Sequence, residues 1–252
     1  MGIKKRNTII TIIILLIVFL NNQTKGQTIK IKSLDGKNQT INVVHDSDWD
    51  ILTITTLKDT LHIEGCNAVE QANSLNEYFI KIIYQVRGGS GIRLRHMMIL
   101  TSKNNILYQS LHITSLFNEQ LIDYSKSPAS STPDRSSLYE VKIKSLDNGH
   151  NNQKMIVIIH NAEKSKDHPR NDYDKESNVT LSFDKIKNMF YSNYAEVSQY
   201  FLFYDPKTRQ ESKQYLMGRV PLIKLGKYHY YYIRGEWYEI SGNSNLSRYS
   251  YK

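Results

Sequence analysis

A glycine- and arginine-rich segment, residues 87–96, has the residue types and spacing that best suit binding of an anion. Its glycines let the backbone form a tight, exposed turn whose amide groups can face a negative charge. Arg93 and Arg95 are two residues apart, so in a strand both project from one face and can grip a carboxylate, phosphate or sulfate. The alternative is an ordinary hairpin with arginines on a solvated face. The candidate anion-binding residues are Arg87, Gly88, Gly89, Gly91, Arg93, Arg95 and His96.

A tyrosine-rich run, residues 228–238, is the second candidate site. In a strand, Tyr228, Tyr230 and Tyr232 share one face, and aromatic rings on a sheet can stack on sugars or on peptide side chains. Together with Trp237 they form a candidate aromatic platform. The alternative is ordinary packing of one strand face in the core.

The sequence shows no recognisable motif for catalysis or metal binding. Ser90 does not fit the G-x-S-x-G nucleophile elbow, because Ile92 stands where the second glycine is needed. Three aspartates in residues 46–50 alternate as in a calcium loop, but Ile51 occupies the position that requires glycine, which favours a simple turn. The eight histidines show no zinc-ligand spacing. The sequence therefore predicts no catalytic residue, metal or cofactor, and it contains no specific nucleic-acid motif.

A seven-residue pattern that occurs twice predicts two β-hairpins. Residues 29–35 (IKIKSLD) recur as residues 141–147 (VKIKSLD). Apolar residues alternate with lysines in both copies, which is the period of a strand with one buried face. The residue pairs Asp-Gly and Asn-Gly at the ends of the copies accept the positive φ of a tight hairpin turn. Internal duplication is one explanation, and convergence of two hairpins on a short alternating pattern is the other.

The stretch between the copies divides the chain into two expected units. It contains two prolines, six serines and no large apolar residue, which is typical of a linker. The expected organisation is a signal peptide at residues 1–26, an N-terminal β unit at 27–124, a Ser/Pro linker at 125–137 and a C-terminal β-rich unit at 138–252.

The expected fold class is mainly β (α+β), with antiparallel hairpins and meanders in two units and one packed helix in the C-terminal half. The helix is expected at residues 182–195, where four apolar residues follow Ser182 at helical spacing. A short helix is expected within residues 66–75, and a long polar surface loop at 164–178. The expected strands cover residues 51–57, 61–63, 78–86, 92–100, 106–113, 199–204, 215–225, 228–233 and 237–240.

The start of the chain has the layout of a secretory signal peptide. Three basic residues precede an apolar run at residues 9–20, and a polar stretch with small residues follows. The apolar run is shorter than the roughly 20 residues of a membrane-spanning helix. Cleavage before Gln27 would leave an exported protein, periplasmic or extracellular, with no membrane span. The alternative is an uncleaved N-terminal anchor.

Charge and cysteine content fit an ordinary exported protein. Loss of the signal lowers the net charge from +9 to about +5, which suits acidic polymers but also any lysine-rich exported chain. Cys66 is the only cysteine and cannot form an intrachain disulfide. A buried lone thiol is the commoner outcome, and a disulfide with another chain is the alternative.

These features favour an exported, non-enzymatic binding or interaction protein of the cell envelope or extracellular space. Its expected partner is an anionic or carbohydrate ligand or another envelope protein. One alternative is a hydrolase-type enzyme with dispersed catalytic residues near the glycine- and arginine-rich segment. The other is an electrostatic binder of acidic polymers, which would use the basic hairpin faces. The lysines of those faces are Lys30, Lys32, Lys142 and Lys144.

Overall fold

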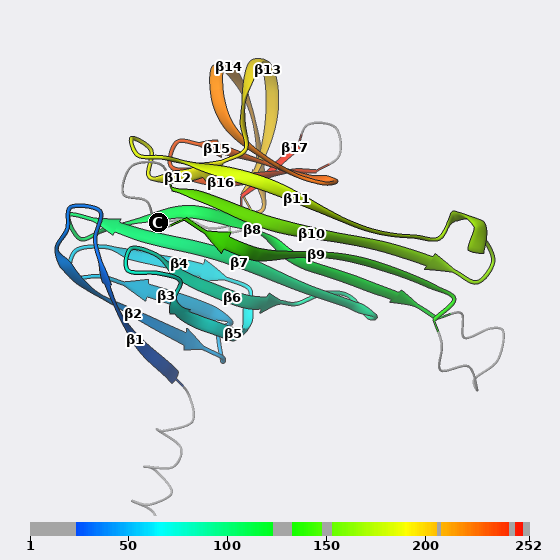
Figure 1. Cartoon of the computed structure of the whole chain (residues 1–252), viewed down its shortest axis with the longest axis horizontal. Coiled ribbons are helices and arrows are strands. Elements are labelled where there is room, and N and C mark those ends of the chain that lie inside the picture. Colours follow the sequence, from blue (N-terminus) through cyan, green and yellow to red (C-terminus); the bar gives the residue numbers. More distant parts are fainter. Residues whose placement is uncertain (1–23, 123–132, 148–152, 206–207, 242–244, 249–252) are drawn as a thin grey trace, which may run out of the picture.

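The computed structural model describes residues 24–122, 133–147, 153–205, 208–241 and 245–248, and most of them lie in β-strands. They form a four-stranded sheet, an eight-stranded sheet and a small closed barrel (Figure 1). The prediction of a mainly β fold is confirmed. The expected signal peptide lies outside the described residues, except that the first strand begins at Thr24.

The four-stranded sheet is an antiparallel meander in the order β1-β2-β3-β4. Ile29 and Ile31 of the first repeat copy are buried, while Lys30 and Lys32 are exposed on the other face. The hairpin turns at Gly36, whose φ of 82° favours glycine. The strands are β1 Thr24–Lys32, β2 Asn38–Asp46, β3 Ile51–Thr55 and β4 Thr60–Glu64.

The eight-stranded sheet lies between the other two parts, in the order β12-β11-β10-β9-β8-β7-β6-β5. Its middle strands are buried on both faces. In β7, Met98 and Leu100 pack in a core shared with the four-stranded sheet, whereas Met97 and Ile99 pack in a core shared with the barrel. Burial on both faces explains the continuous apolar runs in these strands. The strands are β5 Cys66–Ser74, β6 Ile80–Val86, β7 Ile92–Lys103, β8 Ile106–Leu121, β9 Arg135–Leu146, β10 Lys154–Ser165, β11 Tyr173–Asp184 and β12 Met189–Tyr191.

The second repeat copy lies in β9, which pairs antiparallel with β10. Val141 is buried, while Lys142 and Lys144 are exposed, as in the first copy. Both copies therefore form the first strand of an antiparallel hairpin, and their origin by duplication stays a prediction.

The eight-stranded sheet takes strands from both sides of the expected linker. β8 and β9 pair directly, although residues 123–132 between them lie outside the described residues. Most of the expected linker falls in that gap, and residues 135–137 already belong to β9. The division into two units stays a prediction.

The barrel closes through parallel pairing of its first and last strands, β13 and β17. In Figure 1 the long hairpin of β13 and β14 stands out above the sheets. The barrel has a small core of its own around Val197, Phe201, Ile233 and Leu246. Its strands are β13 Asn193–Asp205, β14 Gln210–Leu225, β15 Tyr228–Ile233, β16 Glu236–Ser241 and β17 Asn245–Arg248.

The prediction of a helix at residues 182–195 is wrong. β11 continues to Asp184, a tight turn follows, and β12 returns antiparallel to it. Phe183 and Phe190 are cross-strand partners in this hairpin. Their separation of seven residues corresponds to two helical turns, but partners across this tight turn have the same separation. The Asp184 carboxylate accepts two backbone N–H groups within the turn and thereby stabilises it.

The prediction of a loop at residues 164–178 is also wrong. This stretch forms the far end of the β10–β11 hairpin, closed by the short 3-10 helix η1 Pro169–Asn171. Residues 173–178 are exposed on both strand faces, so no apolar alternation marks them in the sequence. The short helix expected within residues 66–75 is absent, because β5 occupies this stretch and its two bulges interrupt the alternating pattern.

Candidate functional site

The glycine- and arginine-rich segment forms the β6–β7 turn and the first half of β7. Gly91 has a φ of 76°, and a Cβ atom at this position would collide with the carbonyl oxygen of Gln120. Gly88 is equally constrained, because a Cβ atom there would collide with the backbone of Ile92. These glycines are therefore needed for the hairpin itself, and Gly89 lies between them in the same turn.

The arginines of the segment pair with carboxylates of the chain itself. Arg93 and Arg95 share one face of β7, as predicted, and both contact Glu70 at 3.0 and 3.1 Å. Arg95 also contacts Glu140 at 3.1 Å. Partial burial alone would raise the pKa of Glu70, but hydrogen bonds from neighbours that include both arginines lower it overall. Arg87 is bound at 2.8 Å to an aspartate of the β2–β3 turn.

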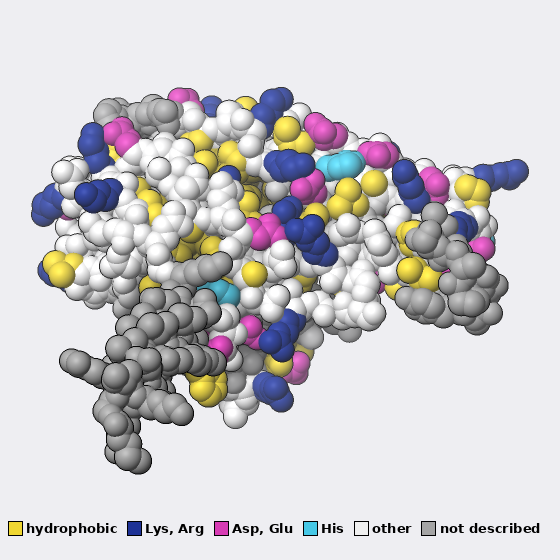
Figure 2. Space-filling view, turned by 90° about the horizontal axis from the view of Figure 1, so that it is seen from below, with side chains coloured by type: hydrophobic (Ala, Val, Ile, Leu, Met, Phe, Trp, Pro, Cys, Tyr) yellow, Lys and Arg dark blue, Asp and Glu magenta, His cyan; other side chains and the backbone are white. Residues whose placement is uncertain are grey.

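Basic and acidic side chains alternate on the sheet face seen in Figure 2. Lys32 contacts Glu77 at 2.8 Å, and Lys142 contacts Glu140 at 2.7 Å. Two of the four lysines proposed for binding acidic polymers therefore have carboxylate partners within the chain.

Most of the candidate aromatic platform is packed into the core. Tyr230, Tyr232 and Trp237 are buried against the eight-stranded sheet. The Trp237 indole N–H donates a hydrogen bond to the backbone oxygen of Gln109 at 2.7 Å. Tyr228 alone is half-buried, so it is the member of this group that a ligand can reach.

The two sequence-predicted segments meet at one cavity, which we call the sheet–barrel cavity. His96 comes from the arginine-rich segment and Tyr228 from the tyrosine-rich run, and both line this space of about 390 Å³. Its size falls in the range of small-molecule sites, roughly 300–1,000 Å³. All three parts of the fold contribute to it. The lining residues are Glu64, Tyr84, Val86, Leu94, His96, Thr114, Phe117, Tyr228, Glu239 and Ser247.

Glu239 of β16 is one of two carboxylates in the cavity wall, the other being Glu64 of β4. The Thr114 hydroxyl donates a hydrogen bond to its carboxylate at 3.3 Å, and the Thr114 backbone N–H donates to the Tyr230 hydroxyl at 3.1 Å. Burial raises the pKa of Glu239 to about 7, although the Thr114 hydrogen bond and the positive charge of Lys227 act in the opposite direction. The carboxyl group therefore changes its charge near neutral pH.

His96 and Tyr84 also line the cavity, and their rings stack with centroids 5.4 Å apart. Burial lowers the pKa of His96 to about 3, so its imidazole is neutral at physiological pH. The Tyr84 hydroxyl lies 2.8 Å from His112 Nε2, and His112 Nδ1 lies 3.1 Å from Gln109 Oε1. Because the amide oxygen can only accept, the neutral His112 carries its proton on Nδ1 and accepts the Tyr84 proton at Nε2.

The chain places one of its own cations beside the aromatic rings of the cavity. The Lys227 ammonium lies 5.0 Å from the Phe117 ring centroid and 5.4 Å from that of Tyr228. Both distances are within cation–π range, about 6 Å. The rings and the nearby carboxylate therefore form surroundings that attract positive charge.

Sequence reasoning missed Glu239, Thr114 and Phe117. One available signal was that Glu239 lies two residues after Trp237 in an expected strand, so the two side chains share a face. A carboxylate on the face of a buried tryptophan is expected to be buried or to line a cavity. Thr114 and Phe117 carried no comparable signal.

No three side chains of His, Cys, Asp or Glu among the described residues lie close enough together to hold a metal ion. Asp46, at the end of β2, instead accepts the backbone N–H groups of Asp48 and Trp49, and Asp50 pairs with Arg87. No described helix combines the length and the apolar character needed to cross a membrane.

Comparisons of the chain with protein-family models, with curated proteins and with solved structures found no match.

Proposed function

We propose that this chain is an exported binding protein that holds a small organic cation in the sheet–barrel cavity. The observation that carries the proposal is the Glu239 carboxylate, which lies in the wall of a cavity that also presents Tyr84, Phe117 and Tyr228. A carboxylate with aromatic rings around it is the chemistry that recognises ammonium groups. The interaction gains strength because the site is partly shielded from water.

The position of Lys227 supports this choice of ligand. Its ammonium already lies over Phe117 and Tyr228 and interacts with the charge of Glu239. A ligand cation would take over these contacts, while the flexible lysine side chain turns outward. The contacts of the Lys227 ammonium thus have the same chemistry as those that the ligand cation would make.

Choline is a suitable probe, because 3,3-dimethylbutan-1-ol has nearly the same shape without the charge. Isothermal titration calorimetry should show choline binding at least about tenfold more tightly than the neutral alcohol. The Glu239→Gln variant should lose this preference, whereas Glu236→Gln, on the same strand but outside the cavity, should retain it. Equal affinity for the two probes in the wild-type protein would contradict the proposal.

The Lys227→Met variant tests the competition directly. It keeps the apolar stem and removes the internal cation, so choline should bind more tightly than to the wild-type protein. Weaker binding would show that Lys227 supports the ligand rather than competing with it.

Export is supported by the N-terminal sequence, whose basic, apolar and polar regions follow one another as in a signal peptide. Mass spectrometry of the secreted or periplasmic protein should find Gln27, or a residue within a few positions of it, at the N-terminus. A full-length, membrane-bound product would contradict cleavage.

The pKa of Glu239, raised by burial to about 7, favours one second candidate, general acid–base catalysis in the same cavity. A carboxyl group that titrates near neutral pH can exchange protons with a bound substrate, and His96 provides a second, neutral group. A panel of 4-nitrophenyl esters and glycosides tests this candidate. Turnover that disappears in Glu239→Gln and persists in Glu236→Gln would favour the enzyme, and no turnover would favour binding alone.

A further inference from the structure

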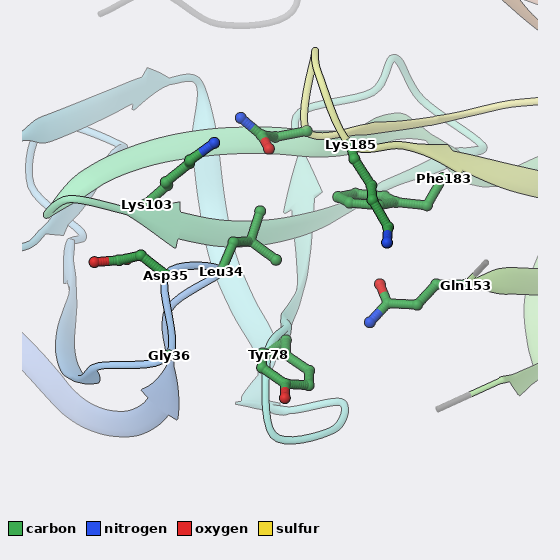
Figure 3. A pocket seen from close by; sticks show the side chains of 9 residues that line it. Leu34, Asp35, Gly36, Tyr78, Lys103, Gln153, Phe183 and Lys185 are labelled. Carbon is green, nitrogen blue, oxygen red and sulfur yellow. The ribbon is translucent and has the colours of Figure 1, made fainter. Parts of the chain in front are cut away.

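A second cavity lies at the end of the sheets where several turns meet, and we call it the turn cavity (Figure 3). Its volume is about 510 Å³, also within the range of small-molecule sites. The β1–β2 turn, the β5–β6 turn, the end of β7, the start of β10 and the β11–β12 turn all contribute. The lining residues are Leu34, Asp35, Gly36, Tyr78, Lys103, Gln153, Phe183, Lys185 and Asn188.

Two buried amide side chains line this cavity. Gln153 is 6% exposed and Asn188 is 3% exposed. The amide oxygens Gln153 Oε1 and Asn188 Oδ1 have no hydrogen-bond partner among the described residues. Buried polar atoms in folded proteins almost always have partners, so these two acceptors require an explanation. A ligand with hydroxyl donors would satisfy both.

The backbones of both amides are fixed. The Gln153 carbonyl accepts the Phe183 N–H at 3.0 Å, and the Asn188 carbonyl accepts the Ser110 hydroxyl at 2.7 Å. Asn188 has a φ of 56°, a left-handed conformation that asparagine tolerates better than most residues. The acceptors are therefore held in place before a ligand arrives, which lowers the cost of binding.

Two lysines give the cavity a positive charge. Figure 3 shows Lys185 and Gln153 pointing toward one another across the cavity, with Lys103 in another part of the wall. The one carboxylate in the lining, that of Asp35, already accepts the Asn104 backbone N–H at 3.2 Å and lies 3.6 Å from the Lys37 ammonium. With two lysines and one aspartate, the lining carries a net positive charge, which suits a negatively charged ligand.

Aromatic side chains complete the lining. Tyr78 and Phe183 both border the cavity, on opposite sides of the space into which Gln153 points (Figure 3). Flat apolar faces of this kind pack well against the C–H face of a sugar ring.

We propose that the turn cavity binds an anionic sugar. The lysines bind its acidic group, the two amide oxygens accept its hydroxyl groups, and the aromatic rings pack against its ring. This site is separate from the sheet–barrel cavity and does not depend on the function proposed for that cavity.

Glucuronate and glucose are a matched pair of probes, because they differ in the acidic group alone. Calorimetry of the full chain should show binding of glucuronate and at least about tenfold weaker binding of glucose. The double variant Lys103→Gln plus Lys185→Gln should reduce the affinity for glucuronate to that for glucose. Lys154→Gln, an exposed lysine beside Gln153 that does not line the cavity, should have no effect.

Asn188→Gly tests the amide contacts without disturbing the turn, because glycine accepts the same positive φ. It should weaken glucuronate binding about fivefold or more, with unchanged circular dichroism. No glucuronate binding by the wild-type protein, or equal binding by the double-lysine variant, would overturn the proposal. Choline binding should be unaffected by all these variants, so the outcomes for the two cavities are distinguishable.

Discussion

The Thr114 hydroxyl donates a hydrogen bond to the Glu239 carboxylate at 3.3 Å, across 125 positions of the sequence. It joins the central strand β8 of the eight-stranded sheet to β16 of the barrel. The backbone N–H of Thr114 also bonds the hydroxyl of Tyr230, so one residue of the sheet contacts the barrel twice. The cavity proposed for ligand binding forms beside this junction.

Glu239 should make the stability of the protein depend on pH. Its pKa is raised from 4.5 to about 7 in the folded protein, so the folded state retains a proton that the unfolded state loses. The stabilisation is fully present below about pH 4.5 and is lost as the pH rises through about 7. Glu239→Gln keeps an acceptor for Thr114 but cannot ionise. As the pH rises from about 4.5 to about 7, the unfolding free energy of the variant should therefore increase by up to about 3 kcal/mol relative to that of the wild-type protein.

Urea unfolding at a series of pH values measures this difference, with Glu236→Gln as the control. Parallel curves for Glu239→Gln and the wild-type protein would show that Glu239 titrates normally.

The two arginines of the candidate anion site should contribute unequally to stability. The Arg95 side chain is 19% exposed and contacts both Glu70 and Glu140, whereas that of Arg93 is 58% exposed and contacts Glu70 alone. Arg95→Ala removes one cationic partner from each of two partly buried carboxylates and breaks the link between them, so it should cost about 2–4 kcal/mol even though Arg93 and Lys142 remain. Arg93→Ala should cost less than about 1 kcal/mol. Chemical denaturation tests both, and similar small losses would indicate that Arg95 has a role other than holding the sheet together.

Tyr84→Phe should lower the stability of the protein, because it breaks the buried chain of hydrogen bonds through His112. The variant removes the hydroxyl that lies 2.8 Å from His112 Nε2 and leaves a fully buried acceptor without its donor. The expected loss is about 1–3 kcal/mol of unfolding free energy. Tyr200→Phe, at an exposed position of β13, is the matched control and should be neutral. Equal effects of the two substitutions would contradict this assignment.

Cys66 should be unreactive in the folded protein. The thiol is buried, and burial raises its pKa to about 12, so almost no thiolate exists at neutral pH. Ellman's reagent should label it in urea but not under native conditions. A Ser47→Cys variant provides an exposed thiol as the positive control. Rapid native labelling of Cys66 would show that the strand it begins opens easily.

Much of the β-structure could be predicted, because one-sided strands leave an alternating pattern in the sequence. β15 has the predicted bounds, since its aromatic run ends at the Arg234-Gly235 turn, where both residues have positive φ. The helix failed because Phe183 and Phe190 have a spacing that a tight hairpin shares with two helical turns. The β10–β11 hairpin was missed because its far end is solvated on both faces.

The site was predicted only in part. His96 and Tyr228 were both named from the sequence, but their meeting at one cavity depends on how the barrel docks onto the sheet. Local sequence patterns cannot predict that docking, because it brings together residues more than a hundred positions apart. Arg93 and Arg95 do share a face, yet their partner Glu70 lies on a strand that the sequence did not predict.

The affinity for choline at about pH 6 and about pH 8 tests the central claim most directly. Ionised Glu239 attracts the cation, and a carboxyl pKa of about 7 predicts about tenfold tighter binding at the higher pH. His96 and His112 stay neutral over this range, because burial lowers both of their pKa values. In Glu239→Gln the affinity should be weak and independent of pH. Choline binding that is equally tight at both pH values, or that survives in Glu239→Gln, would contradict the account.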